Sequence, residues 1–162
     1  MAFHAPVNYL CPFCLVVHGQ EHAQVYTRQT DIVYRDRDLT VFICSHQFPT
    51  NHGHTLIVPN SHYENLYDLP TALGQQILSL TRALGLAMKA ALGCAGVTVW
   101  QSNEPVGDQT VWHYHIHVIP RFPNDAYLQQ LADLEHTYHE LPPELRAAYA
   151  ERLQHKLRIN EV

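Results

Sequence analysis

The sequence predicts an α+β fold with an antiparallel sheet of about five strands, one long helix and a helical C-terminal extension. Segments rich in β-branched and aromatic residues follow one another along the chain, and a single long amphipathic segment lies between the third and the fourth of them. Strands in this order favour an antiparallel sheet over alternating β–α units. Apolar residues make up 46% of the 162 residues, and a chain of this length can bury a core without disulfides.

Five segments have the composition of β-strands and are bounded by turn residues. A turn at Arg37-Asp38 separates the first two segments, which form a predicted hairpin, and a loop with Pro49 and Gly53 precedes the third. The predicted strands cover residues 31–36, 39–44, 54–59, 96–102 and 110–121.

The long helix is predicted over residues 71–92. Apolar residues such as Ile77, Leu80 and Leu84 recur there at spacings of three and four, as on the buried face of an amphipathic helix. Gly93 follows directly and is a typical residue for a helix end.

The character of the chain changes after Pro123, which divides it into a predicted catalytic domain, residues 1–123, and an extension, residues 124–162. Spaced leucines predict one short helix near Leu128, and Pro142-Pro143 opens a second helix. The extension carries no motif, so three roles stay open for it: capping a site, strengthening a dimer or selecting a leaving group.

Charge and hydropathy exclude several classes of partner. Acidic residues outnumber basic ones by 15 to 10, which argues against binding to a nucleic acid polymer. The longest apolar runs, such as Leu56-Ile57-Val58, are far shorter than the roughly 20 residues of a membrane span. Pro6 and Asn8 interrupt the N-terminal apolar residues, so no signal peptide is expected.

Cysteine usage predicts a cytoplasmic protein. The four cysteines are fewer than a short secreted chain uses as a disulfide framework. Cys11 and Cys14 form a CxxC pair, for which three interpretations remain: half of a zinc site, a reduced pair without metal, or a redox pair. A redox pair is expected between a strand and a helix, and no predicted strand precedes this one, so the zinc interpretation is favoured.

Thirteen histidines are the most unusual feature of the composition, and three of them alternate with apolar residues in the fifth predicted strand. Side chains of a strand alternate between its faces, so Trp112, Tyr114, Ile116 and Val118 are expected on one face. The opposite face would carry His113, His115 and His117.

Strand geometry separates the roles of these three histidines. The outer two would lie about 13 Å apart at the backbone, whereas the ligand nitrogens of one zinc ion lie only a few ångströms apart. Two neighbouring histidines can therefore share a metal, but three on a straight strand cannot. A neutral imidazole whose other nitrogen is anchored can act as a nucleophile or as a donor to a phosphate oxygen.

The segment His113-Tyr-His115-Ile-His117-Val-Ile119 resembles the signature of the histidine triad (HIT) family. Further landmarks of that family occur in the same order, and the resemblance covers roughly residues 9–123. These landmarks are Cys11-Pro-Phe-Cys14, Gly53-His54-Thr-Leu-Ile-Val-Pro59, His62, Asn103 and Gln109.

The resemblance implies a HIT-like fold, a homodimer with a sheet continuous between subunits, and a hydrolase or nucleotidyl transferase. Its substrates would be nucleotides such as dinucleoside polyphosphates or nucleoside phosphoramidates. Within the triad, His115 would attack the α-phosphorus and form a covalent nucleotidyl-histidine. His117 and His54 would donate to phosphate oxygens, and Asn103 and Gln109 would position the phosphate or its leaving group. No catalytic metal is required by this chemistry.

The resemblance also implies a structural zinc ion. Zinc-bearing branches of the family would place its ligands at Cys11, Cys14, His62 and His113. Two thiolates and two imidazoles suit a closed tetrahedral site. His113, which the resemblance counts with His115 and His117 among the catalytic residues, would then also hold the metal and leave the other two histidines free.

Two positions depart from the family pattern. Asp108 stands where many members have a glycine, next to Gln109, and His46 stands where many have an Asp or Asn that binds the ribose. We expect His46 to contact the substrate, since an imidazole can still bond a ribose hydroxyl. Two alternatives to the nucleotide hydrolase remain: a metallohydrolase with a catalytic metal, and a nucleotide-binding scaffold without turnover.

Overall fold

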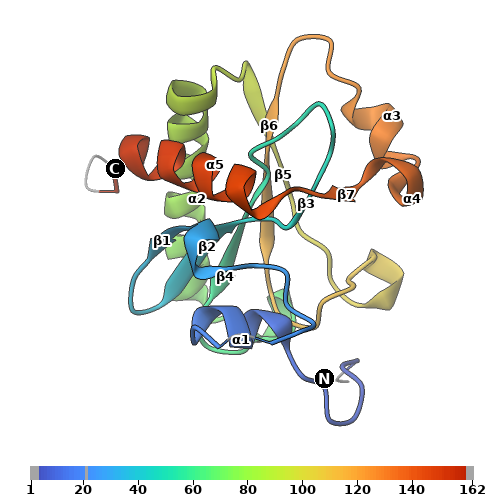
Figure 1. The fold of residues 1–162 in the computed structure, drawn as a ribbon. Coiled ribbons are helices and arrows are strands. Elements are labelled where there is room, and N and C mark those ends of the chain that lie inside the picture. The colour runs from blue at the N-terminus through green and yellow to red at the C-terminus, as the bar shows by residue number, and fades with distance from the viewer. Residues whose placement is uncertain (1–3, 21, 160–162) are drawn as a thin grey trace.

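The computed structural model describes residues 4–20 and 22–159 and contains a five-stranded antiparallel sheet (Figure 1). The strand order is β1-β2-β4-β6-β5, and every neighbouring pair is antiparallel. This arrangement confirms the predicted α+β fold. The strands are β1 (Ile32–Arg35), β2 (Leu39–Ile43), β4 (Thr55–Pro59), β5 (Gly96–Trp100) and β6 (Ile116–Arg121).

Helices and a second, two-stranded sheet complete the structure. The small sheet pairs β3 (His46–Gln47) with β7 (His139–Glu140). The α-helices are α1 (Pro12–Val17), α2 (Thr71–Leu92), α3 (Tyr127–Leu131), α4 (Leu134–Thr137) and α5 (Pro143–Lys156), and short 3-10 turns occupy Gln29–Asp31, Leu66–Asp68 and Pro105–Gly107. No helix within the described residues is long and apolar enough to cross a membrane.

The long helix α2 has the bounds that the sequence predicts. Gly93 ends it with φ 71°, a left-handed conformation that costs glycine little. Its buried face, which includes Ile77 and Leu84, packs on the main core together with α5. Figure 1 shows α5 crossing α2 on this side of the sheet.

The opposite face of the sheet carries α1 and the candidate site. Phe13 and Val16 of α1 pack with Phe42 and Leu56 in a second apolar cluster. Every residue of β2 and β4 is buried, because both faces of these central strands are covered. The main core therefore lies on one face of the sheet, and a second apolar cluster lies on the other.

The histidine strand begins later than the sequence predicts. A strand is expected from residue 110, but β6 starts at Ile116, and residues 110–115 are irregular. The partner strand explains this, because Pro59 has no N–H to donate and its carbonyl accepts the Nε2–H of His113. Trp112 consequently lies beside a cavity rather than in the core with Tyr114, which corrects the predicted apolar face.

Helix α5, in the predicted C-terminal extension, packs closely against α2, β1 and β2. Arg146 of α5 is 0% exposed and donates to the Asp31 carboxylate over 2.9 Å. Its other nitrogens donate to the carbonyl oxygens of Leu141 and Tyr26. Ala150 and Leu153 add to the main core, so α5 is integrated into the fold.

Candidate active site

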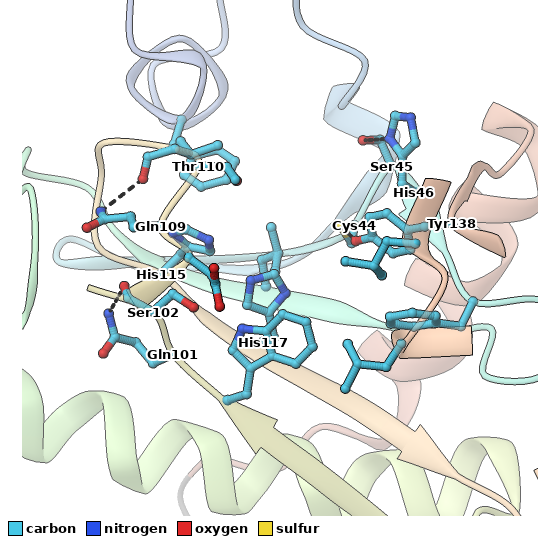
Figure 2. A pocket seen from close by; sticks show the side chains of 18 of the residues that line it. Cys44, Ser45, His46, Gln101, Ser102, Gln109, Thr110, His115, His117 and Tyr138 are labelled. Atoms are coloured by element: carbon cyan, nitrogen blue, oxygen red, sulfur yellow. Dashed lines mark hydrogen bonds between the residues drawn. The ribbon is translucent and has the colours of Figure 1, made fainter. Parts of the chain in front are cut away.

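A cavity of about 1400 Å³ opens above the face of the sheet that carries α1. Its floor follows one cross-strand row, since the register pairs Phe42 with Leu56, Leu56 with His117, and His117 with Trp100. The loop 101–112 lines one side, and residues 44–48 with the C-terminal extension line the other. Figure 2 shows Gln101, Ser102, Gln109 and Thr110 facing Cys44, Ser45, His46 and Tyr138 across His115 and His117.

His115 lies in this cavity in the tautomer of a nucleophile. Its Nδ1 is 2.7 Å from the His113 carbonyl oxygen, which can only accept, so Nδ1 carries the proton and Nε2 keeps a free lone pair. The side chain is 6% exposed, and burial lowers the pKa of its imidazole. His115 is therefore neutral at pH 7, as attack on an electrophile requires.

His117 and His54 form a hydrogen-bonded pair of imidazoles. His54 Nε2 lies 2.9 Å from His117 Nδ1, and His54 is 1% exposed. Burial, with the nearby His115 adding to it, lowers the pKa of His54 to about 3. Burial also lowers the pKa of His117 well below its usual value. The ring of His117 lines the cavity, whereas His54 lies behind it and acts on it through this bond.

Gln47 holds His54 in place, although no sequence pattern points to it. Its Oε1 accepts from the N–H groups of Gly53 and His54, each over 2.9 Å. Its Nε2 donates to the carbonyl oxygens of Cys44 and His54. The buried amide thus uses its whole bonding capacity to close the 44–54 loop.

The four predicted zinc ligands lie together in the structure. The ligand atoms of Cys11, Cys14, His62 and His113 are all within 4.8 Å of one another. Cys11 Sγ is 3.3 Å from His113 Nδ1, and Cys14 Sγ is 3.3 Å from His62 Nδ1. A tetrahedron with metal–ligand bonds of 2.1–2.3 Å has edges of about 3.4–3.8 Å, so the cluster has the size of a zinc site.

The protonation of the cluster also fits a metal. His113 Nε2 donates to the Pro59 carbonyl oxygen over 2.9 Å, which leaves the Nδ1 lone pair facing the two sulfurs. Burial raises the pKa of the Cys11 thiol to about 12, so a thiolate there needs a neighbouring cation. The residues present therefore fit a closed, structural zinc site.

Comparisons with known proteins agree with this geometry. The pattern of the HIT domain matches residues 26–124. The chain belongs to the HIT family. An uncharacterized HIT-like protein of Saccharolobus solfataricus is 30% identical over 116 residues, which cover 72% of this chain and 77% of the relative.

This HIT protein is also similar to a phosphoramidase and to a protein of known structure. The adenosine 5′-monophosphoramidase of Schizosaccharomyces pombe is 29% identical over 117 residues, which cover 72% of this chain and 77% of the relative. The crystal structure of a Hit-like protein of Bartonella henselae superposes with a TM-score of 0.72 at 25% identity, covering 91% of this chain and 96% of that chain.

The amide side chains of Gln109 and Asn103 form hydrogen bonds with backbone groups of this HIT protein. Gln109 lines the cavity, but its Nε2 donates to the Glu64 carbonyl oxygen over 2.6 Å and its Oε1 accepts from the Glu104 N–H over 2.8 Å. Asn103 accepts from the Leu66 N–H over 2.8 Å and lies outside the cavity lining. Both amides fasten the loop that forms one wall.

His46, for which a substrate contact is expected from the sequence, lines the cavity on the side opposite Gln109. Its Nδ1 is 3.1 Å from the Ser45 hydroxyl oxygen, and its ring lies edge-on to Tyr26. Burial lowers the pKa of His46, so the imidazole is neutral. A neutral ring has one nitrogen that donates and one that accepts. Because Nδ1 contacts Ser45, Nε2 remains available to a ligand.

The cavity carries little positive charge. Among the described residues that line it there is no lysine or arginine, and Asp108 is its carboxylate. Its polar groups are neutral imidazoles, hydroxyls and amides. Any anion bound there must therefore be held by directed hydrogen bonds.

Proposed function

We propose that this HIT protein cleaves nucleotides at the α-phosphate through a covalent intermediate on His115. The supporting observation is the hydrogen bond from His115 Nδ1–H to the His113 carbonyl oxygen. It leaves the Nε2 lone pair of a neutral imidazole in a cavity large enough for a nucleotide.

The reaction would proceed in two displacements. In the first, His115 Nε2 attacks the α-phosphorus, the P–N bond forms, and the bond to the leaving group breaks with its electron pair. In the second, water attacks the same phosphorus, the P–N bond breaks, and the nucleoside monophosphate is released. The leaving group takes up a proton from solvent in the first step, and the attacking water releases a proton to solvent in the second, so the enzyme returns to its starting state.

His117 would stabilise the charge that develops on the phosphate. Its Nδ1 is engaged by His54, which directs Nε2 toward the cavity. A positioned N–H donor to such an oxygen typically accounts for about 10²–10³ in rate. No metal is needed at the phosphate in this scheme.

The charge of the cavity favours nucleoside phosphoramidates over dinucleoside polyphosphates. A polyphosphate carries several negative charges, which proteins usually meet with arginine, lysine or Mg²⁺. The lining residues offer none of these side chains and include Asp108. A leaving amine, neutral or cationic, suits this wall better, and the relative in Schizosaccharomyces pombe is named as a phosphoramidase.

We infer that Cys11, Cys14, His62 and His113 hold one structural zinc ion. The ion would fasten the N-terminal segment to the sheet. It would also fix His113, whose carbonyl oxygen sets the tautomer of His115. Zinc would thus support the nucleophile from outside the cavity, while His113 itself stays out of the reaction. The thiols of this set, and the free thiols of Cys44 and Cys94, fit the reducing cytoplasm.

We infer further that two chains form a homodimer through β5. This strand lies at the edge of the sheet, where Val97 and Val99 are 37% and 48% exposed. Helix α2 also exposes Leu78 and Leu86. An exposed apolar edge strand favours pairing with another chain. Light scattering should give twice the chain mass, and Val99→Lys should give monomers; a wild-type monomer would contradict the proposal.

Mass spectrometry of protein quenched during turnover tests the function directly. With adenosine 5′-phosphoramidate, we expect an adenylyl group on His115 and release of AMP. A protein that binds AMP but forms neither adduct nor product would be a scaffold. Activity that is lost with a chelator and restored by metal, while the fold persists, would indicate a catalytic metal instead.

A further inference from the structure

We propose that Tyr138 of the C-terminal extension is a positioning residue that fixes the tautomer of His117 through His54. The inference deepens the proposed function, because it assigns the donor that His117 presents to the phosphate. It also gives the extension a specific role at the site.

The fold brings Tyr138 to the back of the histidine pair. Pairing of β7 with β3 fastens the chain just after Tyr138 to the cavity wall, and its ring packs on Phe48 at 4.9 Å. The Tyr138 hydroxyl oxygen lies 3.4 Å from His54 Nδ1 and 3.1 Å from Cys44 Sγ. Figure 2 shows Tyr138 and Cys44 together on the side of the cavity opposite Gln109.

These contacts form one chain of hydrogen bonds with one proton for each link. In the proposed direction, the Cys44 thiol donates to the Tyr138 oxygen, and the Tyr138 hydroxyl donates to His54 Nδ1. His54 then carries its proton on Nε2 and donates it to His117 Nδ1. A neutral His117 that accepts at Nδ1 has its proton on Nε2, the nitrogen left to face a phosphate oxygen.

The reverse direction would present the wrong group to the substrate. His117 would donate from Nδ1 to His54, and a bare Nε2 lone pair would face the phosphate. The chemistry of Cys44 argues against this direction, because a thiol sulfur is a weaker acceptor than an imidazole nitrogen. The Tyr138 hydroxyl, which lies near both, therefore donates to His54 Nδ1 and accepts from the Cys44 thiol.

Both outer groups keep their protons at neutral pH. Burial raises the pKa of the Cys44 thiol, and burial together with the nearby Cys44 raises the pKa of Tyr138 well above its usual value. The chain of donors is therefore complete across the range in which the imidazoles are neutral.

Nitrogen NMR of the zinc-loaded, 162-residue protein reads the tautomers directly. In the wild type, we expect His54 and His117 to be protonated at Nε2. Tyr138→Phe keeps the ring and removes the donor, so both imidazoles should become mixtures of tautomers. We expect kcat for the phosphoramidate to fall about fivefold to tenfold, with KM unchanged, as for the loss of one neutral hydrogen bond.

Two further variants separate this role from packing. Tyr127→Phe removes a hydroxyl from a second buried tyrosine that also packs on Phe48, and it should leave both tautomers and kcat unchanged. Cys44→Ser keeps a donor and should preserve the Nε2–H form, whereas Cys44→Ala should weaken it. Unchanged tautomers in Tyr138→Phe would overturn the inference. Because NMR needs no turnover, a protein without activity would refute the proposed function and leave this test intact.

Discussion

At the scale of single residues, the three triad histidines differ because the second ring nitrogen of each has a different partner. His113 donates from Nε2 to Pro59, and His115 donates from Nδ1 to the His113 carbonyl oxygen. His117 is engaged at Nδ1 by His54. Local alternation predicts that His115 and His117 lie near each other, but the roles depend on these tertiary bonds.

The neutral, buried His54 predicts a pH dependence of stability. Its pKa is about 3 in the folded protein and near 6.5 in the unfolded chain. Between these values the unfolded chain binds a proton that the folded protein does not. The free energy of unfolding should therefore fall as pH falls below 6.5, by about 1.4 kcal/mol per pH unit from this group.

Urea unfolding from pH 7 to pH 4.5 measures this effect as a difference between variants. His54→Gln should show a shallower decline than the wild type. His155→Gln, in which an exposed helical histidine is replaced, should keep the wild-type slope. If the free energy of unfolding declined with pH equally in His54→Gln and the wild type, His54 would not be a buried neutral imidazole.

Gln47 supports a prediction about positioning. Gln47→Leu has similar size but leaves the N–H groups of Gly53 and His54 without their acceptor. Unsatisfied buried groups cost about 1–3 kcal/mol each, so the thermal midpoint should fall by at least several degrees. Activity of the folded fraction should fall as well; a variant with wild-type stability would show that water replaces the amide.

At the scale of elements, the sequence predicts regular segments well and their irregular ends poorly. Apolar spacing and Gly93 define α2 completely. The predicted start of β6 is wrong because the alternation of side chains along one strand contains no information about the partner strand, where Pro59 has no N–H to donate. Tyr138 and Gln47 are single residues without a local pattern, and only the pairing of β3 with β7 and the turn at Gly53 give them a role.

The attachment of α5 depends on a buried ion pair. Asp31→Ala removes the buried carboxylate of the fully buried Arg146 and leaves it only the half-exposed Glu140 at 3.3 Å, and loss of one partner of a buried pair typically costs about 3–5 kcal/mol. Arg37→Ala breaks a surface pair with Asp38 and should cost less than about 1 kcal/mol. Urea unfolding compares the two; similar small losses would show that α5 is held by its apolar contacts alone.

At the scale of the whole molecule, zinc would link the N-terminal segment, the turn after β4 and the triad. Removal of zinc by a chelator should lower the thermal midpoint by about 10 °C or more, because structural zinc supplies several kcal/mol. Proteolysis should then cut near α1 first. Cys14→Ser should behave like the chelated wild type, and an unchanged midpoint after metal removal would contradict a structural role.

The candidate site combines residues from distant parts of the chain. The predicted fold, the zinc ligands and the two cavity histidines come from motifs that lie between Cys11 and Ile119. The extension beyond residue 123 carries no motif, yet it supplies Tyr138 and part of the cavity wall. Sequence patterns therefore predict the chemistry of the site more fully than its enclosure.

The central claim is that His115 Nε2 takes up the nucleotidyl group. Mass spectrometry of protein quenched during turnover of adenosine 5′-phosphoramidate should place one adenylyl group on the peptide that contains His115. His115→Ala should carry no adduct and lose at least about 10³-fold in turnover, while Tyr127→Phe should label as the wild type does. Full turnover by His115→Ala, or an adenylyl group on another residue, would contradict the account.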